Sequence, residues 1–152
     1  MSTGQNKRAL VCGAGGFIGN HLVNQLKEDG LYVVGVDLKY PEYSKSLADE
    51  FFISDLRIFD NVDNILKEGF DEVYQLAADM GGIEYISGTN DADIMTNSVL
   101  INLNILKSAV SHNIQSVLYS SSACVYAEEK QQDIASIDCR ESSSYPANPD
   151  TE

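Results

Sequence analysis

The chain up to Ser121 alternates between short apolar runs and longer segments whose apolar positions recur at helical spacing. An apolar run of strand length that is bounded by turn residues is typical of a buried β-strand. Five runs fit this description and predict strands at Arg8–Gly13, Leu31–Asp37, Glu50–Ser54, Glu72–Ala78 and Ser116–Ser121.

Three segments between these runs predict helices. From Phe17 onward, apolar side chains recur every three or four residues, and Gly30 is placed to end that helix. Further helices are expected around Ile58–Lys67 and over Ala92–Ser111. Strands that alternate with helices need crossover connections, and right-handed crossovers place the strands parallel in one sheet. The sequence therefore predicts an α/β fold, a Rossmann-like doubly wound parallel sheet with strand order 3-2-1-4-5.

Beyond this pattern the chain becomes polar. Residues 127–152 include Pro146 and Pro149 and show no apolar periodicity, although compact domains seldom end in a long irregular segment. We expect one domain at residues 1–126 and an irregular tail at 127–152, which either packs as a loop or leads toward a further element.

Composition narrows the class of protein. The 152 residues suffice for one domain, and an apolar content of 43% is ordinary for a folded chain. No apolar run approaches the roughly 18 residues that span a bilayer, and the first residues lack a secretory signal. We therefore expect a cytoplasmic protein with no membrane partner. The net charge of −13 argues against a nucleic-acid partner, yet backbone N–H groups can still bind a small phosphate-bearing ligand.

The cysteines Cys12, Cys124 and Cys139 are odd in number and include no C-x-x-C pair. With no histidine near them, a zinc site and a disulfide framework are both poor interpretations, and no metal is expected. Free thiols in a reducing compartment fit this pattern best.

A glycine-rich turn follows the first predicted strand and opens the first predicted helix. The segment "CGAGGFIG" has the spacing Gly13-x-x-Gly16-x-x-Gly19. Glycine permits a tight turn there and lets backbone N–H groups approach a pyrophosphate at the helix N-terminus. The predicted pyrophosphate site comprises Gly13, Gly16, Phe17, Ile18 and Gly19.

Asp37 ends the second predicted strand, about 20 residues after the glycine motif. A carboxylate at this place can accept hydrogen bonds from the adenosine ribose, which favours NAD over NADP. Two alternatives stay open, because Asp37 could simply serve a strand-end turn and Lys39 could meet a 2′-phosphate.

Further cofactor contacts are expected at the ends of the third and fourth strands. Asp55, together with Leu56, could reach the adenine, but Asp55 could equally cap the helix that begins near Ile58. Ala77 and Ala78 are small where a dinucleotide would cross the sheet, although packing alone would also explain them.

The carboxyl ends of the fourth and fifth strands are where ligands bind in open α/β sheets. After the fourth strand, "ADMGG" ends in Gly81 and Gly82, which permit close approach of a substrate or form a turn. After the fifth, Ser122 and Cys124 would lie over the cofactor crevice, where a positive nicotinamide favours the thiolate. On the residues alone, Cys124 is either such a reactive thiol or a buried structural cysteine.

Taken together, these motifs resemble the extended short-chain dehydrogenase/reductase superfamily of nucleotide-sugar epimerases and dehydratases. Within it, "LAADMGG" (Leu76–Gly82), "SSACVY" (Ser121–Tyr126) and the later "YPANPDTE" look like the GDP-mannose 3,5-epimerase family. The resemblance implies NAD as cofactor and a nucleotide-sugar substrate, with a GDP-hexose favoured. The cysteine in "SSAC" argues against a nucleotide-sugar 4-epimerase or dehydratase, where threonine or serine is usual.

The resemblance also implies a mechanism. The hexose is oxidised at C4, protons are exchanged at C3 and C5, and hydride return restores the cofactor. Cys124 would act as an acid/base for these protons. Ser122 would hydrogen-bond the C4 oxygen, and Gly81 and Gly82 would border the sugar.

One departure from the family concerns its Tyr-x-x-x-Lys pair. Tyr126 has Lys130 at the right spacing, but it lies ahead of the family's catalytic helix, and we regard this match as coincidence. The C-terminal part of the family fold is also absent from these residues. We therefore expect a truncated N-terminal domain that binds NAD weakly or not at all and has no turnover alone. A stand-alone, non-catalytic dinucleotide-binding module is the alternative, and a homodimer is compatible with either.

Overall fold

A computed structural model describes residues 6–80, 85, 91–122, 125–127 and 140–145. The predictions for Gly81, Gly82 and Cys124 fall outside these residues. The chain divides into two compact units, Met1–Tyr119 and Ser120–Glu152. No helix among the residues described is both long and apolar enough to cross a membrane.

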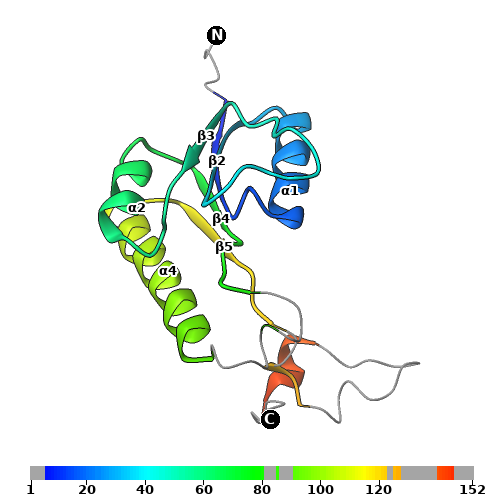
Figure 1. Cartoon of the computed structure of the whole chain (residues 1–152), viewed down its shortest axis with the longest axis vertical. Coiled ribbons are helices and arrows are strands. Elements are labelled where there is room, and N and C mark those ends of the chain that lie inside the picture. Colours follow the sequence, from blue (N-terminus) through cyan, green and yellow to red (C-terminus); the bar gives the residue numbers. More distant parts are fainter. Residues whose placement is uncertain (1–5, 81–84, 86–90, 123–124, 128–139, 146–152) are drawn as a thin grey trace, which may run out of the picture. The chain divides into compact units, whose positions relative to one another are not determined.

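The first unit is built on a five-stranded sheet in which every neighbouring pair is parallel (Figure 1). The strand order is β3-β2-β1-β4-β5, which confirms the predicted topology. The strands are β1 (Arg8–Cys12), β2 (Tyr32–Asp37), β3 (Glu50–Ile53), β4 (Glu72–Gln75) and β5 (Ser116–Tyr119).

Helices cover both faces of this sheet, with α1 on one side and α2 and α4 on the other (Figure 1). Successive strand residues point to opposite faces, so each strand supplies two cores. On one face, Ala9, Val11 and Val33 pack with Val23 and Leu26 of α1. On the other face, the core comprises Leu10, Cys12, Val34 and Val36 with Val62, Ile65, Leu66, Ile101, Ile105 and Ala109. The helices are α1 (Phe17–Glu28), α2 (Phe59–Leu66) and α4 (Asp91–Ser111).

Helix α1 ends as its sequence predicts. Gly30 has a φ of +84°, its N–H donates to the carbonyl of Lys27, and the N–H of Leu31 donates to that of Leu26. This pair of bonds is a Schellman motif, which satisfies carbonyls that the helix end would leave open. The chain then enters β2 directly.

The five strands lie within the predicted ranges, and two of them end at least two residues earlier than predicted. β4 ends at Gln75, whose side chain binds the backbone that follows, with Nε2 donating to the Ala77 carbonyl at 2.6 Å. β5 ends at Tyr119, where the first unit also ends. In the second unit, Glu141–Ser144 forms a 3-10 helix that the sequence pattern did not predict.

Candidate functional site

The first unit contains a cavity of about 730 Å³ at the carboxyl ends of its strands. A volume of this size suits a small organic ligand or a large part of a dinucleotide. The carboxyl edge of a doubly wound sheet is also where such ligands bind. Of the predicted site residues, the cavity is lined by Gly13, Gly16, Asp37, Asp55, Leu56, Ala77 and Ala78.

The glycine turn has no space for side chains. Gly13 has a φ of +82°, and a Cβ there would lie 2.9 Å from the backbone N of Ala77. A Cβ on Gly19 would lie 2.0 Å from the carbonyl oxygen of Gly13, because α1 packs directly on the turn. The backbone itself therefore forms the cavity wall beside Gly13 and Gly16.

Helix α1 begins at this turn with unsatisfied backbone donors. Gly16 is its N-cap, no side chain caps it, and its first turn holds no acidic residue. The first N–H groups of a helix lack carbonyl partners, and here the ladder starts with Asn20 donating to Gly16 at 3.0 Å. The N–H groups of Phe17, Ile18 and Gly19 can thus bind an anion, aided by the helix dipole.

The side chains of Phe17 and Ile18 do not line the cavity. They are 69% and 70% exposed, and Gly19 lies behind the turn. Any contact these residues make with a phosphate must therefore come from their backbone.

Asp37 lies in the cavity wall beside the glycine turn. Its Oδ2 accepts a hydrogen bond of 2.9 Å from the Gly15 N–H, and its Oδ1 accepts one of 3.3 Å from the Lys39 N–H. The Lys39 ammonium pairs with Glu42 at 2.5 Å. Asp37 thus keeps a fixed position at the end of β2 and retains acceptor capacity on Oδ1.

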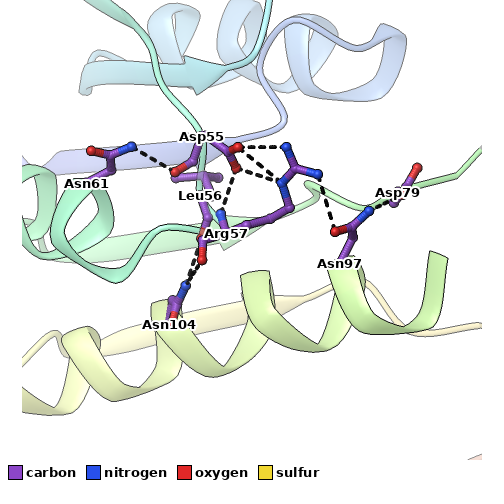
Figure 2. Close-up of polar contacts among 7 residues, drawn as sticks. All are labelled: Asp55, Leu56, Arg57, Asn61, Asp79, Asn97 and Asn104. Carbon is purple, nitrogen blue, oxygen red and sulfur yellow. Dashed lines mark hydrogen bonds and ion pairs between the residues drawn. The ribbon is translucent and has the colours of Figure 1, made fainter. Parts of the chain in front are cut away.

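Asp55 forms an ion pair with Arg57, two residues later (Figure 2). Arg57 donates from Nη2 to Oδ2 at 2.7 Å, from Nε to Oδ1 at 2.9 Å, and from its backbone N–H to Oδ1 at 2.9 Å. These bonds hold the pKa of the Asp55 carboxyl below its usual value. The alternative that Asp55 caps α2 is wrong, because the N-cap of that helix is Ile58.

Two asparagine side chains hold the backbone around Asp55 (Figure 2). Asn61 donates to the Asp55 carbonyl at 3.1 Å, and Asn104 of α4 donates to the carbonyls of Leu56 and Arg57 at 3.1 and 2.9 Å. Among the hydrogen bonds of the described residues, none uses the Leu56 N–H as donor. Asp55 and Leu56 therefore offer the cavity an acceptor next to a donor.

A second polar chain connects Arg57 to the end of β4. Arg57 Nη1 donates to Asn97 Oδ1 at 3.3 Å, and Asn97 Nδ2 donates to Asp79 at 2.7 Å (Figure 2). The Tyr85 hydroxyl donates to the other Asp79 oxygen at 2.8 Å. The bond from Asn97, followed by that from Tyr85, lowers the pKa of the Asp79 carboxyl.

Sequence reasoning missed several cavity residues, above all Arg57 and Asn97. Asn97 lies inside a helix, and the helical period carries no information about ligand contacts. Arg57 directly follows the predicted pair Asp55 and Leu56, and this position in the sequence is a signal for it. Ser122 belongs to the second unit, Ser120–Glu152, and its assignment to the substrate stays a prediction.

The fold and the cavity together define a domain of the dinucleotide-binding Rossmann class. An unblocked helix N-terminus suits a pyrophosphate, and Asp37, Asp55 and the Leu56 N–H suit the polar groups of an adenosine. The NAD dependent epimerase/dehydratase family matches residues 9–149. The chain belongs to this family, which confirms the predicted superfamily and, at the level of the family, its NAD dependence.

Individual relatives agree with this assignment. GDP-mannose 3,5-epimerase of Arabidopsis thaliana is 39% identical over 147 residues, covering 95% of this chain and 38% of the relative. UDP-glucose 4-epimerase of Thermus thermophilus, solved as a complex with NAD, superimposes with a TM-score of 0.75 at 26% identity. That match covers 93% of this chain and 44% of the other.

A third similarity is to MoeE5, solved with UDP-glucuronic acid and NAD. Its TM-score is 0.67 at 32% identity, covering 79% of this chain and 38% of the other. The chain thus spans less than half the length of each of these relatives. The cofactor prediction agrees with a family in which solved members carry NAD.

Proposed function

We propose that the cavity of the first unit binds NAD, with the pyrophosphate at the N-terminus of α1 and the adenosine between Asp37 and Asp55. The observation that carries this proposal is the turn at Gly13–Gly19, where no side chain caps the N-terminus of α1 and a Cβ at Gly13 or Gly19 would clash. When bound, NAD supplies reversible hydride transfer. The protein supplies anion-binding N–H groups, an acceptor for the ribose at Asp37, and a fixed edge for the adenine at Asp55 and Leu56.

The substrate proposed is a nucleotide sugar, and the reaction is epimerisation as in GDP-mannose 3,5-epimerase. The support is the 39% identity to that enzyme and the presence of its motifs around Gly81, Gly82, Ser122 and Cys124. Cys124 would move protons at C3 and C5 of the hexose, while Ser122 would hold the C4 oxygen. Gly81 and Gly82 would leave room for the sugar beside the cofactor site.

We also propose that these 152 residues alone have no turnover and bind NAD weakly or not at all. Within them, no Tyr-x-x-x-Lys pair occurs where the family's hydride chemistry needs one. Reading the source DNA beyond codon 152 tests this directly. A Tyr-x-x-x-Lys pair within the next codons would support an epimerase, whereas a stop codon would favour a binding module that senses NAD.

Solvent isotope exchange tests the reaction. The protein from the whole reading frame is incubated with GDP-mannose in deuterated buffer, and deuterium at C3 and C5 is measured by NMR. We expect exchange at both carbons, lost in a Cys124→Ser variant. Exchange that is as fast in Cys124→Ser as in wild type would show that this residue does not move the protons. Epimerisation at C4 alone, without deuterium uptake, would instead indicate a 4-epimerase. The oligomeric state follows from sedimentation of the same protein, for which a homodimer is our expectation.

A further inference from the structure

We propose that Arg57 is a positioning residue that fixes the Asp55 carboxylate as an acceptor for the amino group of adenine. Arg57 would thereby give the cavity a preference for adenine over hypoxanthine. The inference rests on the proposed binding of NAD and adds to it a residue that sets the choice of base.

Arg57 holds the Asp55 carboxylate in place. Three donors of Arg57 reach it: Nη2 lies 2.7 Å from Oδ2, the backbone N–H lies 2.9 Å from Oδ1, and Nε lies 2.9 Å from Oδ1 and 3.1 Å from Oδ2. Nε shares one hydrogen between the two oxygens, so three hydrogens meet about four lone-pair sites and Oδ2 keeps about one for a ligand. Because both oxygens are held, the carboxylate cannot rotate, and the remaining site keeps one direction.

Arg57 is itself held by a neighbouring side chain. Its Nη1 donates to Asn97 Oδ1, and Asn97 is anchored through Nδ2 to Asp79 (Figure 2). The planar guanidinium can serve Asp55 and Asn97 at once because its donors point in fixed, different directions. A lysine ammonium carries the same charge but lacks this fork, so it cannot fix the carboxylate in the same way.

The hydrogen-bonding groups beside the carboxylate match one edge of adenine. Asp55 offers an acceptor, and the neighbouring Leu56 N–H offers a donor, its carbonyl being fixed by Asn104 at 3.1 Å. Adenine presents an amino donor next to a ring-nitrogen acceptor, which matches this pair. Hypoxanthine presents a carbonyl acceptor next to a ring N–H donor, so both positions are mismatched and polar groups stay unpaired.

The positioning effect of Arg57 can be separated from the effect of its charge. The cavity is lined by Asp37, Asp55, Asp79 and Asp93, and among the described residues Arg57 is the only cation in its wall. Removing Arg57 must therefore weaken binding of any nucleotide phosphate through electrostatics alone. That loss is the same for adenine and hypoxanthine nucleotides, so the ratio of their affinities reports positioning only.

The experiment is an NMR titration of the protein from the whole reading frame with 5′-AMP and with 5′-IMP. We expect wild type to prefer 5′-AMP by about tenfold or more. Arg57→Lys should bring this preference below about threefold while 5′-IMP binds nearly as in wild type. Arg57→Met should lose the preference and bind both nucleotides more weakly. The matched control Lys39→Met removes a cation that pairs with Glu42 instead, and should keep the wild-type ratio.

The outcomes distinguish failure of the proposed NAD site from failure of the proposed role of Arg57. If wild type binds neither nucleotide, the proposed NAD site fails and the inference fails with it. If wild type prefers 5′-AMP and Arg57→Lys prefers it equally, the role of Arg57 is wrong and the NAD site stands. If wild type binds both nucleotides equally, the base is not read by Asp55 and Leu56, and the inference is again wrong. Asp55→Asn tests the same acceptor with Arg57 unchanged, so the inference does not depend on the folding of the Arg57 variants. Its amide must also reduce the preference for 5′-AMP.

Discussion

The backbone N–H of Gly15 donates a hydrogen bond of 2.9 Å to Asp37, so that the last residue of β2 holds the turn that follows β1. The contact is tight, since a Cβ on Gly15 would lie 2.2 Å from the Lys39 carbonyl oxygen and 2.8 Å from Asp37 Cγ. Asp37 therefore shapes the glycine turn in addition to any contact it makes with a ribose. The two roles can be separated by substitution.

Asp37→Asn and Asp37→Ala should differ in stability but not in cofactor binding. Asparagine keeps an oxygen for the Gly15 N–H, whereas alanine leaves this donor unpaired and should cost about 1–3 kcal/mol of unfolding free energy. Both variants lose the carboxylate, so NAD affinity should fall by about tenfold or more. Urea unfolding and NMR titration measure the two effects. Equal stability of wild type and Asp37→Ala would show that the Gly15 bond contributes nothing.

Gly19→Ala should disrupt the turn, because the new Cβ would lie 2.0 Å from the Gly13 carbonyl oxygen and backbone must move. Overpacking of this kind costs about 1–3 kcal/mol and should also abolish NAD binding. The matched control is Gly69→Ala, where φ is +82° and nothing lies within 4 Å of the new Cβ. That variant should lose about 1–2 kcal/mol from backbone strain alone and keep its NAD affinity. Retained NAD binding in Gly19→Ala would argue against a pyrophosphate at this turn.

The fold could be predicted because its signals are local. The apolar run of β1, the turn glycines and the C-terminal Gly30 each act through neighbours in sequence, and the strand order follows from crossover handedness. Strand ends were less accurate, as at β4, which ends at Gln75, where the side chain rather than the backbone binds the Ala77 carbonyl. No periodicity carries that information.

The site was predictable only in part, because only some of its contacts join residues that are close in sequence. The glycine motif and the strand-end carboxylates have fixed spacings, and the structure brings Gly13, Gly16, Asp37 and Asp55 to one cavity. The bond between Arg57 and Asn97 joins residues 40 positions apart, and its existence depends on how α4 packs against α2. The capping role considered for Asp55 was wrong, because the N-cap of α2 is Ile58 and the Asp55 carboxylate binds Arg57 instead.

Cys12 should resist alkylation until the protein unfolds. Burial, and secondarily the negative charge of Asp37, raise the pKa of its thiol to about 12. At about pH 8 only about one thiol in ten thousand would be ionised, far fewer than for an ordinary cysteine of pKa about 8.5. Iodoacetamide labelling followed by mass spectrometry of the Cys12 peptide measures this. We expect protection of more than about a thousandfold in native protein relative to protein in denaturing urea, and equal labelling in both would contradict the buried position.

Ser108→Ala should reduce stability at neutral pH and do so less in acid. The Asp63 carboxylate accepts hydrogen bonds from His112 Nε2 at 2.8 Å and from the buried Ser108 hydroxyl at 3.0 Å. These bonds, the one from His112 first, lower the pKa of the Asp63 carboxyl. A lowered carboxyl pKa stabilises the fold above the unfolded-state pKa of about 3.9, and this stability is lost as the pH falls through the lower folded value.

The measurement for Asp63 is the urea midpoint of wild type and Ser108→Ala between about pH 7 and pH 2. The gap between the two proteins should be constant above about pH 4 and should narrow below it, because protonated Asp63 no longer needs the serine donor as strongly. Serine does not titrate, so the change in the gap reports Asp63 and its partners. Ser111→Ala is the control, since that hydroxyl donates to the Lys107 carbonyl at 3.0 Å and meets no carboxylate. A gap that stays the same down to the lowest pH would show that Ser108 stabilises the helix pair by packing and leaves the Asp63 carboxylate unaffected.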